Sequence, residues 1–171
     1  AYVVRGGIYL AQNNPAKAKS DYDQAIFLEP DNAQALAARA SLHISAGRPQ
    51  QAISDFSAVL RLAPDFLQGY VGRGEAYRQA GKVDLAIADF DAVVRLAPKS
   101  PVGYLNRALL LANTGKPLKA LDDIDLAIEF APTYPDSYFY RGQLRVSTGQ
   151  LEAAEADFTK AIQLNPSFGP A

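Results

Sequence analysis

Apolar residues follow the spacing of one helix face along most of the chain, and short breaks separate these stretches. Residues 86–96 show the pattern well, with apolar side chains at Ala86, Phe90, Val93, Val94 and Leu96. A strand would instead alternate apolar and polar residues, so the pattern predicts a helix. Gly81 precedes this stretch and Pro98 follows it. Glycine ends a helix in the left-handed conformation and proline stops one, so both residues mark helix boundaries.

The same pattern returns at a fixed interval over the whole chain of 171 residues. Five prolines are spaced 34 residues apart, at Pro30, Pro64, Pro98, Pro132 and Pro166. With this proline as position 32, position 15 holds Asn13, Gly47, Gly81, Gly115 and Gly149. Each unit therefore predicts two helices with a break near position 15. The five units cover residues 1–32, 33–66, 67–100, 101–134 and 135–168, in one array over residues 1–171.

Further columns identify the repeat. Position 8 is always small, position 20 is always Ala, and position 24 is aromatic or Ile. The third unit carries Tyr70, Arg73-Gly74, Tyr77, Ala86, Phe90 and Pro98 in sequence. This spacing resembles the tetratricopeptide repeat (TPR) family over essentially the whole chain, with Tyr where the family often has Trp and Arg at position 7. The resemblance implies an all-α, right-handed superhelical solenoid of stacked antiparallel helix pairs, used for protein–protein interaction without catalysis.

The hairpin geometry predicts which positions face each other. If the chain turns near position 16, positions whose numbers sum to about 32 lie at the same height. Position 8 then faces position 24, position 4 faces 27 or 28, and position 11 faces 20, so a small side chain meets a ring. His43 is at position 11 and is expected in the core rather than in a catalytic or metal site. Asp65 and Ser100 are expected to cap the helices that follow them.

Two charged columns are the most unusual feature. Position 7 holds Arg5, Arg39, Arg73, Arg107 and Arg141, and position 23 holds Asp21, Asp55, Asp89, Asp123 and Asp157. Their numbers sum to 30, so the two columns are expected at nearly the same height within a unit. One interpretation is a structural ladder of partly buried ion pairs, and the other is a row of arginines offered to an acidic ligand. The equal number of matched carboxylates favours the structural interpretation.

The TPR resemblance also implies a concave groove lined by positions 2, 5, 6, 9, 12 and 13 of the first helices. The candidate partner-binding residues are Val71, Glu75, Arg78, Leu105, Asn106, Leu109, Asp136, Phe139, Tyr140 and Gln143. Val71 and Leu105 fit either peptide binding or packing between first helices, whereas the large rings of Phe139 and Tyr140 favour binding. Some TPR proteins hold a chaperone's terminal carboxylate with Lys at position 5. No Lys stands there, so we expect no such clamp.

Composition narrows the function. There are 17 Lys and Arg against 18 Asp and Glu, which argues against nucleic-acid binding by bulk positive charge. The chain has one His and no Cys, so the sequence predicts no metal site, no cofactor and no enzyme chemistry. No apolar stretch approaches the ~18 residues that a membrane-spanning helix needs.

The expected function is a scaffold that binds a protein or peptide in its groove. Two alternatives stay open: self-assembly through the array ends or groove, and a regulatory arm of an enzyme lying outside this chain. The chain has no Met, and residues 167–171 resemble the entry to another unit, so we expect it to be part of a longer protein. The Arg-Gly and Asp-Phe pairs resemble those of bacterial arrays. The sequence identifies neither the partner, the pathway nor the oligomeric state, and it leaves the compartment open between cytoplasm and periplasm.

Overall fold

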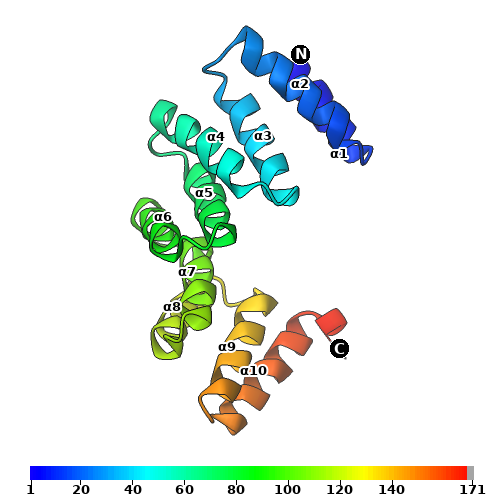
Figure 1. Ribbon diagram of the computed structural model, residues 1–171. Helices are drawn as coiled ribbons and strands as arrows, with labels where there is room; N and C mark the ends of the chain where they lie inside the picture. The colour runs from blue at the N-terminus through cyan, green and yellow to red at the C-terminus, as the bar shows by residue number, and fades with distance from the viewer. Residues whose placement is uncertain (169–171) are drawn as a thin grey trace. The chain divides into compact units, whose positions relative to one another are not determined.

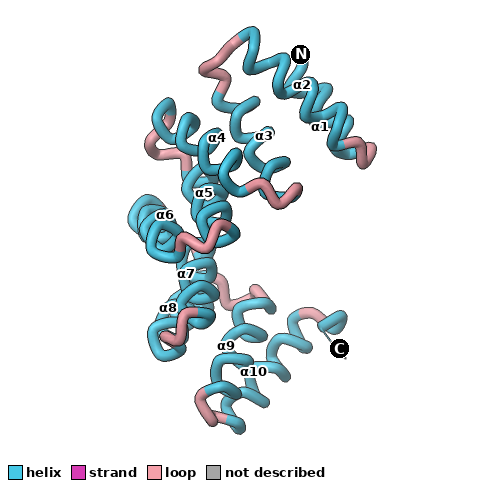
Figure 2. Tube along the Cα trace, in the orientation of Figure 1, coloured by secondary structure: helices cyan, strands magenta, loops and turns pink. Residues whose placement is uncertain are grey.

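The computed structural model describes residues 1–168, and these residues form helices joined by short turns (Figures 1 and 2). No strand occurs within this range. The helices are α1 (Tyr2–Ala11), α2 (Pro15–Leu28), α3 (Ala33–Ser45), α4 (Pro49–Leu62), α5 (Leu67–Gln79), α6 (Val83–Leu96), α7 (Pro101–Asn113), α8 (Pro117–Phe130), α9 (Pro135–Ser147), α10 (Leu151–Leu164) and the short 3-10 helix η1 (Pro166–Phe168). Of the segment expected to enter another unit, residues 169–171 lie outside the described part.

The helices pair in chain order, as the repeat predicts. Residue contacts divide the chain into two compact parts, an N-terminal half (Ala1–Asp89) and a C-terminal half (Phe90–Ala171), with the boundary inside α6. In the N-terminal half, α1 packs on α2 and α3 on α4, and α5 lies against α4. In the C-terminal half, α7 packs on α8 and α9 on α10, and α8 also contacts α9. Each half is therefore a stack of helical hairpins.

The turn inside each hairpin uses the left-handed backbone conformation at position 15. The four glycines there have φ between 65° and 78°, and Asn13 takes the same conformation with φ 55°. Glycine adopts this region without a steric penalty, and Asn tolerates it better than most residues. The predicted role of position 15 is confirmed.

The two side-chain caps expected at Asp65 and Ser100 do not form. Asp65 does not cap α5, because Phe66 occupies the N-cap position. Ser100 does occupy the N-cap position of α7, but its side chain accepts no hydrogen bond from the helix. Pro101 follows it at the first helical position, where its fixed φ favours a helix start without a side-chain cap. Side-chain caps occur instead at Asn14 and Asn32, whose amide oxygens accept hydrogen bonds from the N–H groups of Lys17 and Ala35.

Small residues let the two helices of a hairpin approach closely. All five alanines at position 20 are at most 1% exposed. A Cβ placed on Gly6 would lie 2.5 Å from Cε1 of Tyr22, and one on Gly142 would lie 2.7 Å from Cε1 of Phe158. The predicted contact between positions 8 and 24 is therefore confirmed. His43 is buried at position 11, also as predicted.

Tyrosine at position 4 has a role that spacing alone did not reveal. The hydroxyl groups of Tyr70, Tyr104 and Tyr138 each donate a hydrogen bond of 3.0 Å to the carbonyl of the proline six residues earlier. This bond ties the first helix of a unit to the end of the preceding unit. A Trp ring, which has only an N–H donor in a different place, does not reproduce this geometry.

Candidate partner-binding site

The arginine at position 7 in every unit contacts the aspartate sixteen residues later. Its Nε and Nη2 atoms donate to the carboxylate at 2.6–3.1 Å, as a fork that matches the two carboxylate oxygens. The five pairs are Arg5–Asp21, Arg39–Asp55, Arg73–Asp89, Arg107–Asp123 and Arg141–Asp157. All five aspartates are buried. Position 7 and position 23 therefore contact each other within each repeat, as the sum of their position numbers predicted.

A second set of contacts links neighbouring units, and the sequence reasoning missed it. The Nη1 atom of the same arginine donates to the residue sixteen positions earlier, on the second helix of the preceding unit. These acceptors stand at position 25: Asp23, Ser57, Asp91 and Asp125. A column of three acids and one serine at one position was the signal that could have revealed them.

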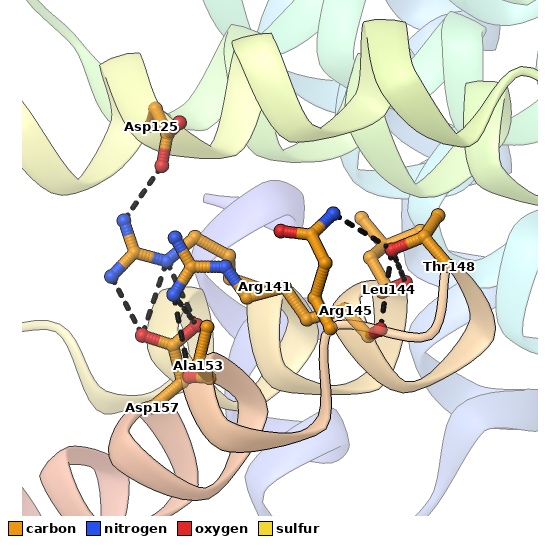
Figure 3. Close-up of polar contacts among 8 residues, drawn as sticks. Asp125, Arg141, Leu144, Arg145, Thr148, Ala153 and Asp157 are labelled. Carbon is orange, nitrogen blue, oxygen red and sulfur yellow. Dashed lines mark hydrogen bonds and ion pairs between the residues drawn. The ribbon is translucent and has the colours of Figure 1, made fainter.

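The last unit shows the network most fully (Figure 3). Arg141 lies between Asp157 of its own unit and Asp125 of the preceding one (Figure 3). Arg145 donates to the same Asp157 at 2.7 Å and to the carbonyl of Ala153 at 3.4 Å. The guanidinium at position 11 thus replaces ring packing with an ionic contact, and one buried carboxylate serves two arginines.

Aromatic rings complete the surroundings of the arginines. In four units the guanidinium carbon lies 5.4–5.8 Å from the ring centre of the position 4 tyrosine, within reach of a cation–π interaction. Arg5 and Arg73 also lie near the position 11 rings of Tyr9 and Tyr77. The hydrogen bond from Arg5 lowers the pKa of Asp21, and the carboxylates raise the arginine pKa values further above their ordinary range. The geometry leaves most of the donors on these arginines occupied inside the protein.

A cavity of about 410 Å³ lies in the C-terminal half of the chain (Phe90–Ala171), between α7 and α9, the first helices of the fourth and fifth repeats. Its lining consists of Pro101, Val102, Leu105, Asn106, Leu109, Ala131, Tyr134, Asp136 and Tyr140. The position numbering predicted Leu105, Asn106, Leu109, Asp136 and Tyr140 in the groove, and the structure brings them together here. It adds Val102, which stands at groove position 2 on the first turn of α7 but was not among the candidate residues, and Tyr134, which lies on the turn before α9 and at none of the groove positions. The volume is within the range of sites that hold small ligands or side chains.

The other candidate residues lie apart from this cavity. Three of them, Val71, Glu75 and Arg78, are on α5, in the N-terminal half of the chain (Ala1–Asp89). Glu75 and Arg78 form a bidentate pair with two contacts of 2.7 Å, which lowers the pKa of the Glu75 carboxyl. Their charges therefore compensate each other on the helix surface. Gln143 is exposed on α9, outside the cavity lining.

Phe139 packs against neighbouring aromatic rings and is not part of the lining of the cavity between α7 and α9. Its ring centre lies 5.8 Å from that of Phe158 on α10 and 5.8 Å from that of Tyr140. Both distances are those of paired aromatic rings. Phe139 thus packs one hairpin together while Tyr140, the next residue, lines the cavity.

The electrostatics of the cavity centre on one carboxylate. Asp136 stands in the first turn of α9, where the positive end of the helix dipole favours a negative charge. A hydrogen bond to this carboxylate raises the pKa of the Tyr134 hydroxyl, helped by partial burial and by the negative charge itself. On the opposite wall, the Asn106 side-chain nitrogen donates to the carbonyl of Val102 at 2.8 Å, so the amide is held against its own helix.

Comparison with known protein families agrees with the repeat pattern. The sequence model of the tetratricopeptide repeat family matches residues 4–65, 37–101 and 71–135, and a second model of the same description matches residues 135–168. The chain belongs to the TPR family. It therefore has the family's all-α fold of stacked antiparallel helix pairs, as the repeat columns indicated. No curated protein sequence matches this TPR chain.

Solved structures share the TPR fold over nearly the whole chain. MamA from Desulfovibrio magneticus RS-1 is 21% identical with a TM-score of 0.85, over 99% of this chain and 96% of that one. A thermophilic TPR protein of Thermus thermophilus is 23% identical with a TM-score of 0.77, over 96% and 90% of the two chains. YrrB, described as a TPR protein with an unusual peptide-binding site, is 21% identical with a TM-score of 0.73, over 96% and 85%. At these identities the likeness establishes the fold.

Two features of residues 1–168 bear on other classes of site. Within residues 1–168, no helix combines the length and the apolar character required to cross a bilayer. In the same range, no three or more His, Asp or Glu side chains lie together as candidate metal ligands. The cavity between α7 and α9 remains the candidate site with the clearest chemistry.

Proposed function

We propose that this TPR chain is a non-catalytic scaffold that binds a segment of a partner protein in the cavity between α7 and α9. The observation that carries the proposal is the meeting of five predicted groove residues around one cavity. Its walls are mostly apolar, and Val102 and Tyr134 are 40% and 44% exposed. Apolar surface that is open to water at a concave site typically marks a place where a partner binds.

The chemistry of the rest of the chain supports binding rather than catalysis. The one histidine, His43, is buried, and burial lowers its pKa. The position 7 arginines, which could have received an acidic ligand, are engaged by Asp side chains instead. An apolar cavity between the first helices of two hairpins fits the recognition of a peptide in which a few side chains supply most of the contact.

A blocked-cavity variant tests this function. A phage library of random peptides is panned on the wild type and on Leu109→Arg, which places a long charged side chain in the cavity lining. Leu118→Arg is the matched control, because Leu118 is 68% exposed on α8 and outside the lining. We expect the wild type and the control to enrich the same peptides and Leu109→Arg to lose them. Equal enrichment by all three proteins would place recognition elsewhere.

End-to-end self-association is a second candidate function, supported by the outer face of α1. The Arg5 guanidinium binds Asp21 through Nε and Nη2, and residues 1–168 offer no acceptor to its Nη1. Val4 and Ile8 on the same helix are 68% and 51% exposed. Thr159 on α10 stands at position 25, where Ser57 accepts a hydrogen bond from Nη1 of Arg73. The Thr159 hydroxyl of a second copy is therefore a candidate acceptor for Nη1 of Arg5.

Light scattering over a concentration series distinguishes this second candidate. Stacking of α10 on α1 predicts a mass that rises with concentration, and Ile8→Arg should return it to the monomer value. A monomer mass at every concentration would rule the association out.

A further inference from the structure

We infer that the cavity between α7 and α9 selects a segment with a Lys or Arg side chain beside an aliphatic one. This inference rests on the proposed function and adds the chemistry of the partner. It follows from three properties of the lining: a single carboxylate, two tyrosine rings next to it, and an aliphatic wall opposite. The site therefore has a polar end and an apolar end, which define two adjacent side chains of a bound peptide.

The charge of the lining is negative. Asp136 is its only ionisable carboxylate, and no Lys, Arg or His contributes to it. The carboxylate already interacts with the Tyr134 hydroxyl, which supplies one neutral donor and leaves its charge uncompensated. A cation from the partner would compensate that charge, whereas an acidic side chain would meet like charge in a partly desolvated space.

The two tyrosines strengthen the preference for a cation. Tyr134 and Tyr140 both line the cavity with Asp136, and Tyr134 is 44% exposed. The face of an aromatic ring attracts ammonium and guanidinium groups, and this attraction adds to that of a nearby carboxylate. Because the pKa of Tyr134 is raised, the hydroxyl keeps its proton at neutral pH and remains a donor to Asp136.

The opposite wall fits an aliphatic neighbour. Val102, Leu105 and Leu109 come from one face of α7 and give that end of the cavity an apolar surface. Asn106 lies between them, and its side-chain oxygen accepts no hydrogen bond from residues 1–168. This oxygen can accept from a backbone N–H of the bound segment and so fix the register of the two side chains.

Peptide selection on charge variants tests the inference. The same phage library is panned on the wild type, on Asp136→Asn, and on Asp122→Asn, an exposed acid of α8 outside the lining. Wild type and Asp122→Asn should enrich peptides with Lys or Arg next to Leu, Ile or Val. Asp136→Asn should keep the aliphatic preference and lose most of the cationic one. Thermal melts check that both variants fold.

A direct affinity measurement completes the test by changing the peptide as well as the protein. One enriched peptide is compared with the same peptide carrying norleucine in place of its cation, using fluorescence anisotropy. The norleucine peptide should bind the wild type about tenfold more weakly. On Asp136→Asn the difference between the two peptides should become much smaller, because only the attraction of the tyrosine rings for the cation remains.

The outcomes separate the two proposals. Cavity-dependent peptides without a cation, or with an acid in its place, would overturn the inference and leave the proposed function standing. Equal loss of the cationic preference in Asp122→Asn would also overturn it, because the effect would then come from general surface charge. If no peptide depends on Leu109, both the function and the inference fail.

Discussion

Breaking the buried pair between Arg73 and Asp89 tests whether the charged columns are structural. The Arg73 side chain is 21% exposed and that of Asp89 is 6% exposed. Two charge-assisted hydrogen bonds of 2.9 and 2.7 Å join them. Arg73→Leu removes both bonds and leaves the Asp89 carboxylate buried without its partner, while the leucine retains much of the packing volume.

The expected size follows from this geometry. Removing one partner of a buried pair costs about 3–5 kcal/mol, because the remaining charge is desolvated and uncompensated. The double variant Arg73→Leu, Asp89→Leu removes both charges and should come within about 1 kcal/mol of the wild type. The single variant should therefore be less stable than the double one. For a chain of this size the single change should lower the melting temperature by about 6–20 °C.

Urea and thermal unfolding of the four proteins in the double-mutant cycle measure the coupling between the two side chains. The matched control is the cycle for Glu75 and Arg78, an exposed pair on the same helix, whose coupling should be only about 0.3–0.5 kcal/mol. If the losses at Arg73 and Asp89 simply add, the two side chains do not act as a pair. The ladder would then contribute nothing specific to the stack.

Three smaller predictions concern stability at other positions. Gly115→Ala should lower the free energy of unfolding by about 1–2 kcal/mol in urea, because its φ of 74° is unfavourable for a residue with a Cβ although space is open around it. Phe139→Ala should lower the melting point clearly, with a cost of about 2–4 kcal/mol, because its ring packs on Phe158; an unchanged melting point would show that the ring contributes no packing. Burial lowers the pKa of His43 below its ordinary 6.5 despite the nearby Asp55, so the unfolded chain binds the proton first. Stability should be full above about pH 6.5 and fall as the pH drops towards the folded pKa, and His43→Leu should remove this step from urea titrations.

The repeat made most of the fold predictable. Proline and glycine at fixed positions mark where helices end, and the requirement that Gly6 and Tyr22 fit together sets the approach of the two helices. The Ser100 cap failed because a cap needs a side-chain rotamer and a backbone angle that residue type alone does not specify. The contacts from Arg107 to Asp91 were missed for another reason. They cross from one unit to the next, whereas the position sums describe heights within a single hairpin.

The candidate site was predictable only in part. Helical spacing identifies which residues of α7 and α9 share a side, and Leu105 and Tyr140 indeed meet at one cavity. Helical spacing does not show which neighbours a side chain packs on, so it predicted Phe139 in the groove and did not reveal the contact of its ring with Phe158. The contribution of Tyr134 depends on the turn before α9, whose course follows from tertiary packing and not from helix periodicity.

Titration of an enriched peptide into the isotope-labelled protein, followed by amide chemical shifts, tests most directly that the cavity between α7 and α9 is where this TPR chain binds its partner. The account predicts that the largest shifts cluster at residues 101–109 and 131–140, and that Leu109→Arg abolishes them. Shifts concentrated on the outer faces of α8 and α10, or shifts that persist unchanged in Leu109→Arg, would contradict it.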